Sequence, residues 1–158
     1  MRILDTAPGA KVLALGHYQP SKVVTNDDLS KTMDTSDEWI RSRVGIQERR
    51  IAGDAESLED MAVQAGGKAL AASGLAASDI DLVIVATCTL TEQIPNAAAR
   101  VAARLGVTAP GAFDVNAACA GFSYALGLAN DAIRSGSSRN ALVIGSEKLS
   151  EWIDLDDR

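Results

Sequence analysis

Cys119 has the sequence surroundings of a nucleophile. It stands between an apolar run, Ala112–Asn116, and a helical pattern that extends to Arg134. At such a strand-to-helix turn, the free amides and the positive dipole end of the helix favour the thiolate over the thiol. The small residues Ala118 and Ala120 leave room for a thioester, and the backbone N–H of Cys119 can donate to an oxyanion. The pattern predicts a reactive cysteine, although a buried structural cysteine at a helix start would share the same position.

The other side chains able to react have less support from their surroundings. Cys88 ends an apolar run, but no helix start follows it directly, so we interpret it as a structural thiol. His17, the only histidine, lies in an expected loop without a visible partner and is interpreted as a surface residue. The chain therefore offers a candidate nucleophile and no convincing general base. No C-x-x-C occurs, and we expect neither a metal site nor a disulfide framework.

Composition indicates an ordinary globular domain of 158 residues, with 47% apolar and 23% charged residues. The net charge of −6, without a block of lysine or arginine, disfavours nucleic acid and anionic membranes as partners. No apolar run reaches membrane-spanning length, and the first residues do not resemble a signal peptide. We therefore expect a reducing, cytoplasmic compartment.

Four apolar runs have the length of strands, and three of them are rich enough in aliphatic residues to be buried on both faces, as in parallel sheets. The first run is Lys11–Leu15, and the three buried ones are Asp81–Thr87, Ala112–Asn116 and Ala141–Gly145.

Helical signals alternate with these runs. Asn26 is the expected N-cap of a short helix over residues 27–33, and Thr35 with Glu38 forms a capping-box pattern for a helix that ends at Gly45. Further helices are expected after Ser57, from Pro95 to Leu105, and over Cys119–Arg134, the last apolar on nearly all sides and therefore central. The alternation predicts an α/β domain with a largely parallel sheet. No G-x-G-x-x-G follows a strand, which disfavours a dinucleotide-binding oxidoreductase.

Three strings together resemble one family, β-ketoacyl-acyl-carrier-protein synthase III. The strings DVNAACAGF (114–122), SDEWIRSRVGI (36–46, followed by Arg49 and Arg50) and VIGSE (143–147) resemble its nucleophile motif, its N-terminal signature and the strand after the nucleophile helix. The resemblance implies a thiolase-like layered α/β fold, with a mostly parallel mixed sheet covered by helices on both faces. Residues 1–158 would form its N-terminal half. A complementary C-terminal half would supply the histidine and asparagine of a Cys-His-Asn site.

The resemblance also implies a reaction. Cys119 would take an acyl group from acyl-CoA, and malonyl-acyl-carrier-protein would lose carbon dioxide and attack the resulting thioester. The product would start a fatty-acid or polyketide chain. The implied partners are acyl-CoA, an acyl carrier protein and a second copy in a homodimer. Coenzyme A enters as a thioester substrate, and no permanently bound cofactor is expected.

Matching positions in the motifs suggest how coenzyme A is held. Trp39 would stack on its adenine and Arg158 would cover the other face. Thr35 would form a hydrogen bond nearby, and Arg43 would meet the phosphates. The residues alone also fit a core tryptophan and a solvated arginine at these positions.

Two further positions bear on specificity. Ile94 stands where the family places a residue that crosses a dimer interface into the acyl pocket, where its modest bulk would admit more than an acetyl group; a residue packed at a helix start fits equally well. Val44 departs from the threonine that the family commonly has, which removes one hydrogen bond of about 1 kcal/mol and points toward a specialised pathway such as polyketide priming.

Two rival functions remain open at this level. A non-decarboxylating acyltransferase would use the same cysteine. A non-catalytic assembly subunit would explain the missing base but not the cysteine motif.

Overall fold

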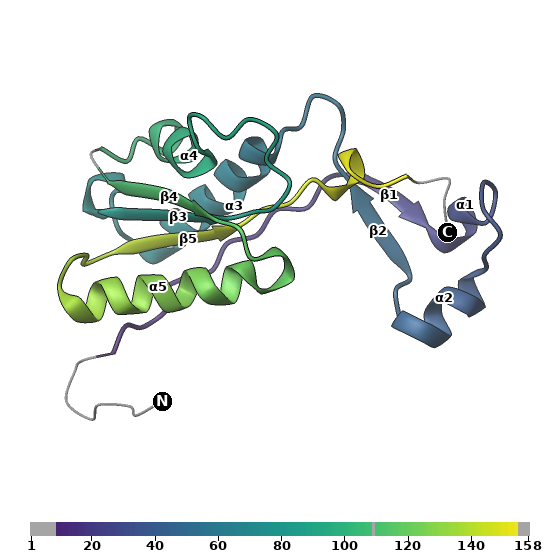
Figure 1. The fold of residues 1–158 in the computed structure, drawn as a ribbon, viewed down its shortest axis with the longest axis horizontal. Helices are drawn as coiled ribbons and strands as arrows, with labels where there is room; N and C mark the ends of the chain where they lie inside the picture. The colour runs from purple at the N-terminus through teal and green to yellow at the C-terminus, as the bar shows by residue number, and fades with distance from the viewer. Residues whose placement is uncertain (1–8, 109, 155–158) are drawn as a thin grey trace. The chain divides into compact units, whose positions relative to one another are not determined.

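The protein, seen here in a computed structural model, is described for residues 9–108 and 110–154. These residues form two compact units, one of residues 9–18 and 58–147 and the other of residues 19–57 and 148–154. Figure 1 labels the elements of both. None of the helices in the described ranges is both long enough and apolar enough to cross a bilayer.

The first unit is an α/β sandwich built on a three-stranded parallel sheet with the order β4-β3-β5. Helices α3 and α4 cover one face of the sheet and α5 covers the other (Figure 1). The bounds are α3 Leu58–Ser73, β3 Leu82–Ala86, α4 Ala97–Leu105, β4 Gly111–Val115, α5 Gly121–Ser135 and β5 Ala141–Gly145. This confirms the predicted α/β class and the predicted sheet covered by helices on both faces.

Strand β3 shows why the central run of the sequence had to be apolar throughout. Val83 and Val85 point into the core formed with α3 and α4, whereas Leu82 and Ile84 point into the core formed with α5. All five residues of β3 are buried. A strand covered on both faces cannot carry the polar alternation of a half-solvated strand.

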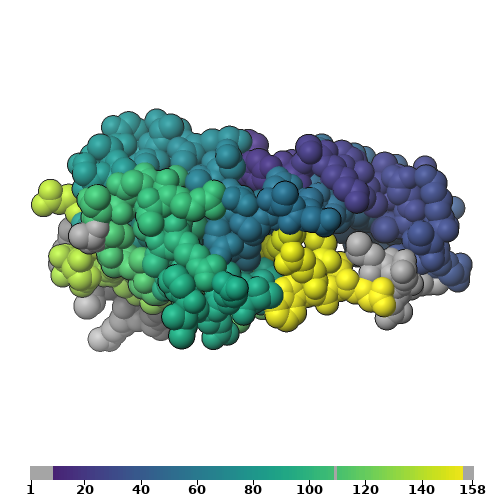
Figure 2. All heavy atoms as spheres, turned by 90° about the horizontal axis from the view of Figure 1, so that it is seen from above, coloured from purple at the N-terminus to yellow at the C-terminus, as the bar shows by residue number. Residues whose placement is uncertain are grey.

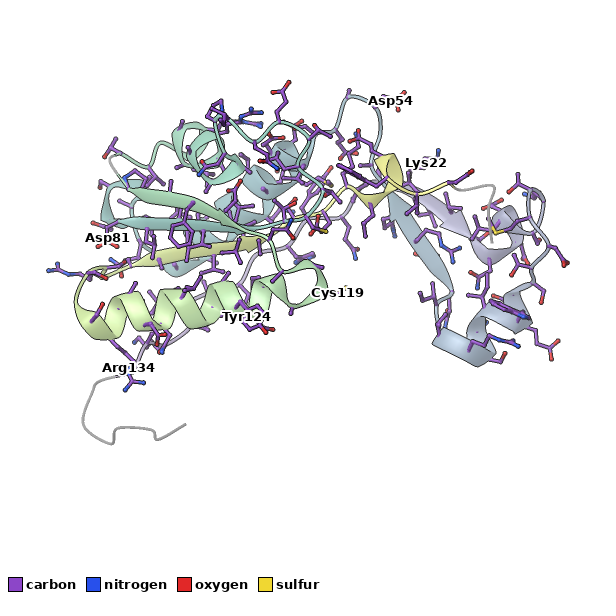
Figure 3. The ribbon with its side chains drawn as sticks, in the orientation of Figure 1. Lys22, Asp54, Asp81, Cys119, Tyr124 and Arg134 are labelled. Atoms are coloured by element: carbon purple, nitrogen blue, oxygen red, sulfur yellow. The ribbon has the colours of Figure 1, made fainter. Side chains whose placement is uncertain are left out.

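The outer strands and α5 are less buried than predicted. Strands β4 and β5 are only partly buried. On α5, Gly121, Ala125 and Ala129 are buried, but Tyr124 and Leu128 remain exposed. In Figure 3, Tyr124 lies on the side of the helix away from the sheet. The expectation of a helix covered on all sides is therefore wrong for the described chain, because the buried residues of α5 all lie on its sheet-facing side.

The predicted strand over Lys11–Leu15 is wrong. Residues 9–20 form no regular structure, and the side chains of Val12 and Leu15 are 68% and 80% exposed. The segment instead packs on α3 at Gly16, where an added Cβ would lie 2.3 Å from the carbonyl oxygen of Ala65. Figure 2 shows the purple atoms of the segment against the blue-green atoms of this unit. A strand needs a neighbouring strand, and its own residues cannot provide one.

The second unit pairs an antiparallel ribbon with two short helices. Strand β1, Lys22–Thr25, runs antiparallel to β2, Glu48–Ile51, and α1, Asn26–Leu29, follows β1 directly. Helix α2 spans Asp37–Val44 and ends at Gly45, as predicted, and Gly45 adopts the left-handed conformation.

Asn26 has a different role from the predicted one. Thr25, not Asn26, caps α1, through a reciprocal pair of hydrogen bonds with Asp28. The buried amide of Asn26 donates to Asp37 Oδ1 and to the carbonyl of Ile46, each at 2.8 Å, and its oxygen accepts from Arg49 Nη2 at 2.9 Å. These contacts fix the start and the end of α2 relative to β2.

Candidate active site

The site residues of the α/β unit lie at one edge of the sheet. Because β3, β4 and β5 are parallel, their last residues, Ala86, Val115 and Gly145, stand side by side. We call this end the carboxyl edge, and the opposite end, where the strands begin, the amino edge. Open α/β sheets hold their ligands beyond the carboxyl ends of their strands.

Cys119 lies at the carboxyl edge, four residues after the end of β4. It occupies the short 3₁₀ turn η2, Ala118–Ala120, and α5 begins at Gly121, two residues later than the predicted helix start. The side chain is exposed, at the end of α5 in Figure 3. The alternative of a buried structural cysteine is therefore wrong for this chain.

The turn that presents Cys119 is strained. Ala118 has a φ of 44°, a left-handed conformation that residues with a Cβ rarely adopt. Ala117 and Ala120, the N-cap positions of η2 and α5, have no side chain able to cap the helical amides. Strained backbone of this kind concentrates at functional sites.

Close packing holds the turn on the sheet at Gly121. A Cβ added there would lie 3.3 Å from the Cβ of Ala86 and 3.8 Å from the carbonyl oxygen of Val115. Glycine thus allows the start of α5, and with it Cys119, to approach the ends of β3 and β4.

Asp114, inside the nucleophile string, ties the neighbouring helix to the same edge. Its carboxylate accepts hydrogen bonds from the amides of Ala97 and Ala98, both at 2.8 Å. Asn96, the N-cap of α4, accepts from the amide of Ala99 and donates to the carbonyl of Ala112. The predicted start at Pro95 is therefore two residues early. A carboxylate at a helix N-terminus also complements the helix dipole.

Glu147 is a feature of the site that sequence reasoning missed as a functional group. Its carboxylate accepts hydrogen bonds from the amides of Cys88 (2.9 Å) and Thr89 (3.1 Å) and from the hydroxyls of Thr87 (3.0 Å) and Thr89. It thereby joins the end of β5 to the loop after β3. The only local signal was an acidic residue directly after a strand, in the string VIGSE.

Cys88 differs from Cys119 in its surroundings. A hydrogen bond to Glu147, with burial and the nearby charges of Glu147 and Cys119, raises the pKa of the Cys88 thiol above its usual value. Cys88 is also less exposed than Cys119. Both observations support the interpretation of Cys88 as a non-nucleophilic thiol.

Ile94 lies in the loop between β3 and α4, and its side chain is 90% exposed. The alternative interpretation, that Ile94 packs at the start of α4, is therefore wrong for this chain.

The proposed coenzyme residues lie in the second unit. Trp39 and Arg43 are both on α2, and the guanidinium carbon of Arg43 lies 4.1 Å from the centroid of the Trp39 ring. Thr35 lies just before α2, whose N-cap is Ser36 rather than the predicted Thr35: the Ser36 hydroxyl accepts from the Trp39 amide at 3.1 Å. Arg158 lies outside the described residues.

The amino edge has a carboxylate cluster of its own. Asp81 accepts hydrogen bonds from the Ser138 hydroxyl and from the amides of Arg139 (2.8 Å) and Asn140 (3.2 Å). Burial raises the pKa of the Asp81 carboxyl, but these hydrogen bonds outweigh it and hold the pKa below its usual value. Residues Asp81 and Asn140 also line a shallow depression at this edge. In Figure 3, Asp81 and Cys119 mark opposite ends of the sheet.

No metal-binding group is apparent in the described part of the chain. Across residues 9–108 and 110–154, no three histidine, cysteine, aspartate or glutamate side chains are arranged to hold a metal ion.

Known proteins resemble this chain both in sequence and in fold. The 3-oxoacyl-[acyl-carrier-protein (ACP)] synthase III family matches residues 113–158. The β-ketoacyl-[acyl-carrier-protein] synthase III 4 of Streptomyces coelicolor is 55% identical over 150 residues, which are 95% of this chain and 48% of that protein. The β-ketoacyl-[acyl-carrier-protein] synthase III of Xanthomonas campestris is 49% identical over 94% of this chain and 46% of its own length.

Solved structures agree with these similarities. The 3-oxoacyl-[acyl-carrier-protein] synthase III of Aquifex aeolicus superposes with a TM-score of 0.91 at 49% identity, over 94% of this chain and 48% of that one. A priming β-ketosynthase from a polyketide biosynthetic pathway superposes with a TM-score of 0.93 at 40% identity, over 100% of this chain and 47% of that one. The chain thus spans about half the length of the relatives it matches. Over that half, it belongs to the β-ketoacyl-[acyl-carrier-protein] synthase III family and has the family's thiolase-like α/β fold.

Proposed function

We propose that Cys119 accepts an acyl group from acyl-CoA, as the first step of a decarboxylative condensation that starts fatty-acid or polyketide chains. The observation that carries the proposal is an exposed cysteine on a strained turn at the carboxyl edge of a parallel sheet. The names of the relatives support it, since they include β-ketoacyl-[acyl-carrier-protein] synthases and a priming β-ketosynthase.

The transfer to Cys119 proceeds in two steps. The thiolate attacks the carbonyl carbon of the acyl-CoA thioester, and the carbonyl oxygen becomes an oxyanion that backbone amides of the turn can stabilise. The oxyanion collapses, the bond to the coenzyme A sulfur breaks, and that sulfur leaves as a thiolate that takes up a proton. The acyl group remains on Cys119 as a thioester.

The condensation then uses this thioester as an electrophile. Malonyl-acyl-carrier-protein loses carbon dioxide, and the electron pair of the broken bond forms a carbanion that attacks the thioester carbonyl. The bond to Cys119 breaks, which releases the thiolate and a 3-ketoacyl-acyl-carrier-protein. Coenzyme A is a substrate in this scheme, and no resident cofactor takes part.

The scheme needs a complementary half that contributes a histidine and an asparagine. Two observations support such a half. His17, the only histidine, is on the segment that packs on α3 rather than on the turn of Cys119. Helix α5 leaves Tyr124 and Leu128 exposed on one side of the helix, four residues apart, an apolar surface suited to a further layer. We also propose that an acyl carrier protein docks at this enzyme and that two copies form a homodimer.

We propose that α2 contributes to coenzyme A binding. Trp39 offers an indole face to the adenine, with Thr35 nearby and Arg158 on the other side of the base. The Arg43 guanidinium occupies one face of the Trp39 ring. Adenine binding on that face therefore requires Arg43 to swing away, which would free it for the phosphates.

The test is transfer of a radiolabelled acyl group from acyl-CoA to the intact protein, with the labelled peptide identified by mass spectrometry. We expect the label on Cys119, its loss in Cys119→Ala, and its retention in the matched variant Cys88→Ala. Label that persists in Cys119→Ala contradicts the assignment. Carbon dioxide release on adding malonyl-acyl-carrier-protein supports condensation, whereas a transferred acyl group without that release supports a simple acyltransferase.

A further inference from the structure

The loop after β3 is held at the carboxyl edge by a single side chain from β5. Thr87, Cys88 and Thr89 direct four donors, two amides and two hydroxyls, to the two oxygens of Glu147. Thr87 and Thr89 are buried. A carboxylate that accepts several hydrogen bonds in a partly buried place fixes its donors firmly, because losing it would leave those donors unpaired.

The same loop is a neighbour of Cys119. The Thr87 amide donates to the carbonyl of Val115 at 3.0 Å, which extends the pairing of β3 with β4 to the residue just before the Asn116–Ala117 turn. The charge of Cys119 also acts on the Cys88 thiol. Among the described residues, Glu147 and Cys119 are the titratable groups that raise the pKa of the Cys88 thiol. Two thiols therefore share the edge, and one of them is hydrogen-bonded to a carboxylate.

We propose that Glu147 is a positioning residue, which fixes the Thr87–Thr89 loop beside Cys119 and keeps the Cys88 thiol from competing for the acyl group. The inference rests on the proposed acyl transfer to Cys119. Within the described part of the chain, the hydrogen bonds of Glu147 go to Thr87, Cys88 and Thr89 rather than to Cys119. It acts on geometry, by closing one side of the site, and on selectivity, by holding the Cys88 proton.

Glu147→Gln is the sharpest variant, because it keeps the shape and one acceptor oxygen but removes the charge. The matched control is Asp114→Asn, a carboxylate at the same edge that binds the amides of α4 and not the Cys88 loop. Thr89→Val is a milder second variant that removes one donor to Glu147 and keeps its charge. If Glu147→Gln fails to fold, the same measurements are made on Thr89→Val.

The first measurement is alkylation of each cysteine by iodoacetamide from pH 6 to 10 in the intact protein, resolved by mass spectrometry. We expect the midpoint for Cys88 to move to lower pH in Glu147→Gln and to stay in place in Asp114→Asn. A purely structural role would not move that midpoint selectively. An unchanged Cys88 profile in a folded Glu147→Gln protein overturns the proposal.

The second measurement is acyl transfer from acyl-CoA. We expect slower labelling of Cys119 in Glu147→Gln, by about tenfold, since misplacing a positioned group by about 1 Å can cost about 100-fold in rate. We also expect some label on Cys88. Labelling of Cys119 at the wild-type rate, with none on Cys88, overturns the proposal. Alkylation needs no acyl donor, so a wild-type protein that takes no acyl group contradicts the proposed function while the Cys88 profile still decides the role of Glu147.

Discussion

At each of the two edges of the parallel sheet, a carboxylate accepts hydrogen bonds from a loop, but the two carboxylates serve different purposes. At the amino edge, Asp81 binds two amides and a hydroxyl of the loop that leads into β5. At the carboxyl edge, Glu147 binds two amides and two hydroxyls of the loop that follows β3. Each carboxylate replaces hydrogen bonds that a strand ladder no longer provides.

The difference lies in what surrounds each carboxylate. The partners of Asp81 belong to a short connection between α5 and β5, in a depression lined mainly by serine, aspartate, arginine and asparagine residues. Glu147 binds the loop that carries a second thiol, Cys88, and that loop pairs with the end of β4, four residues before the exposed Cys119. The comparison teaches that a carboxylate binding backbone amides is not itself a functional signal. Its neighbours decide whether it supports only the fold or also the chemistry.

The largest expected effect comes from Gly121→Val at the carboxyl edge. The new side chain would overlap Ala86 and the end of β4, so we expect the free energy of unfolding to fall by about 2 kcal/mol. The turn of Cys119 must also shift, so acyl labelling should slow in step with the loss of stability. Urea denaturation and the labelling rate measure the two effects in the intact protein.

Two control variants test whether the effect of Gly121→Val depends on the size and the place of the added side chain. Gly121→Ala adds one methyl group and should cost less than the valine. Gly53→Ala, where an added Cβ would lie 4.0 Å from a Glu56 oxygen, should leave labelling unchanged. Labelling at the wild-type rate in Gly121→Val would show that the turn does not depend on this contact.

A smaller effect is expected from Asp81→Ala at the amino edge. The buried Ser138 hydroxyl and two loop amides lose their acceptor, which should cost about 1–2 kcal/mol in the free energy of unfolding. Acyl labelling of Cys119 should keep its wild-type rate, because Asp81 lies at the other end of the sheet. If labelling slows as much as in Gly121→Val, the two edges are coupled and the comparison fails. Asp131→Ala, an exposed carboxylate on α5, is the control.

Local features of the sequence were enough to predict much of this architecture. The run of β3 is apolar because both faces are covered, and Gly45 and Gly136 stop their helices in the left-handed conformation. The position of Cys119 between a strand and a helix is also a local feature, and its surrounding string matches the family. The caps of α1 and α2 were each misplaced by one residue, because neighbouring threonine, serine and asparagine side chains are equally able to cap.

The features that could not be predicted are those that join distant segments. Glu147 binds residues 58 to 60 positions earlier in the chain, and Asp81 binds residues 57 to 59 positions later. The residues next to Glu147 and Asp81 in the sequence do not indicate which distant residues these carboxylates bind. The strand prediction for residues 11–15 failed for a similar reason: a strand requires a neighbouring strand, and none of the described strands pairs with this segment, which meets α3 only at the following Gly16.

The smallest expected effect is a change in how stability depends on pH. Hydrogen bonds hold the pKa of Asp81 below its usual value, so its carboxylate stabilises the fold above the unfolded pKa, about 4, and that contribution is lost as the pH falls through the folded pKa. Asp81→Asn removes the titration, and solvent around the exposed side chain keeps the effect modest. Urea midpoints at pH 7, 5, 4 and 3 should show wild type losing its advantage over the variant toward pH 3, while Asp131→Asn follows wild type. A constant gap at all four pH values would mean that the Asp81 charge contributes nothing, and that its hydrogen bonds at the amino edge are as strong when the carboxyl group is neutral.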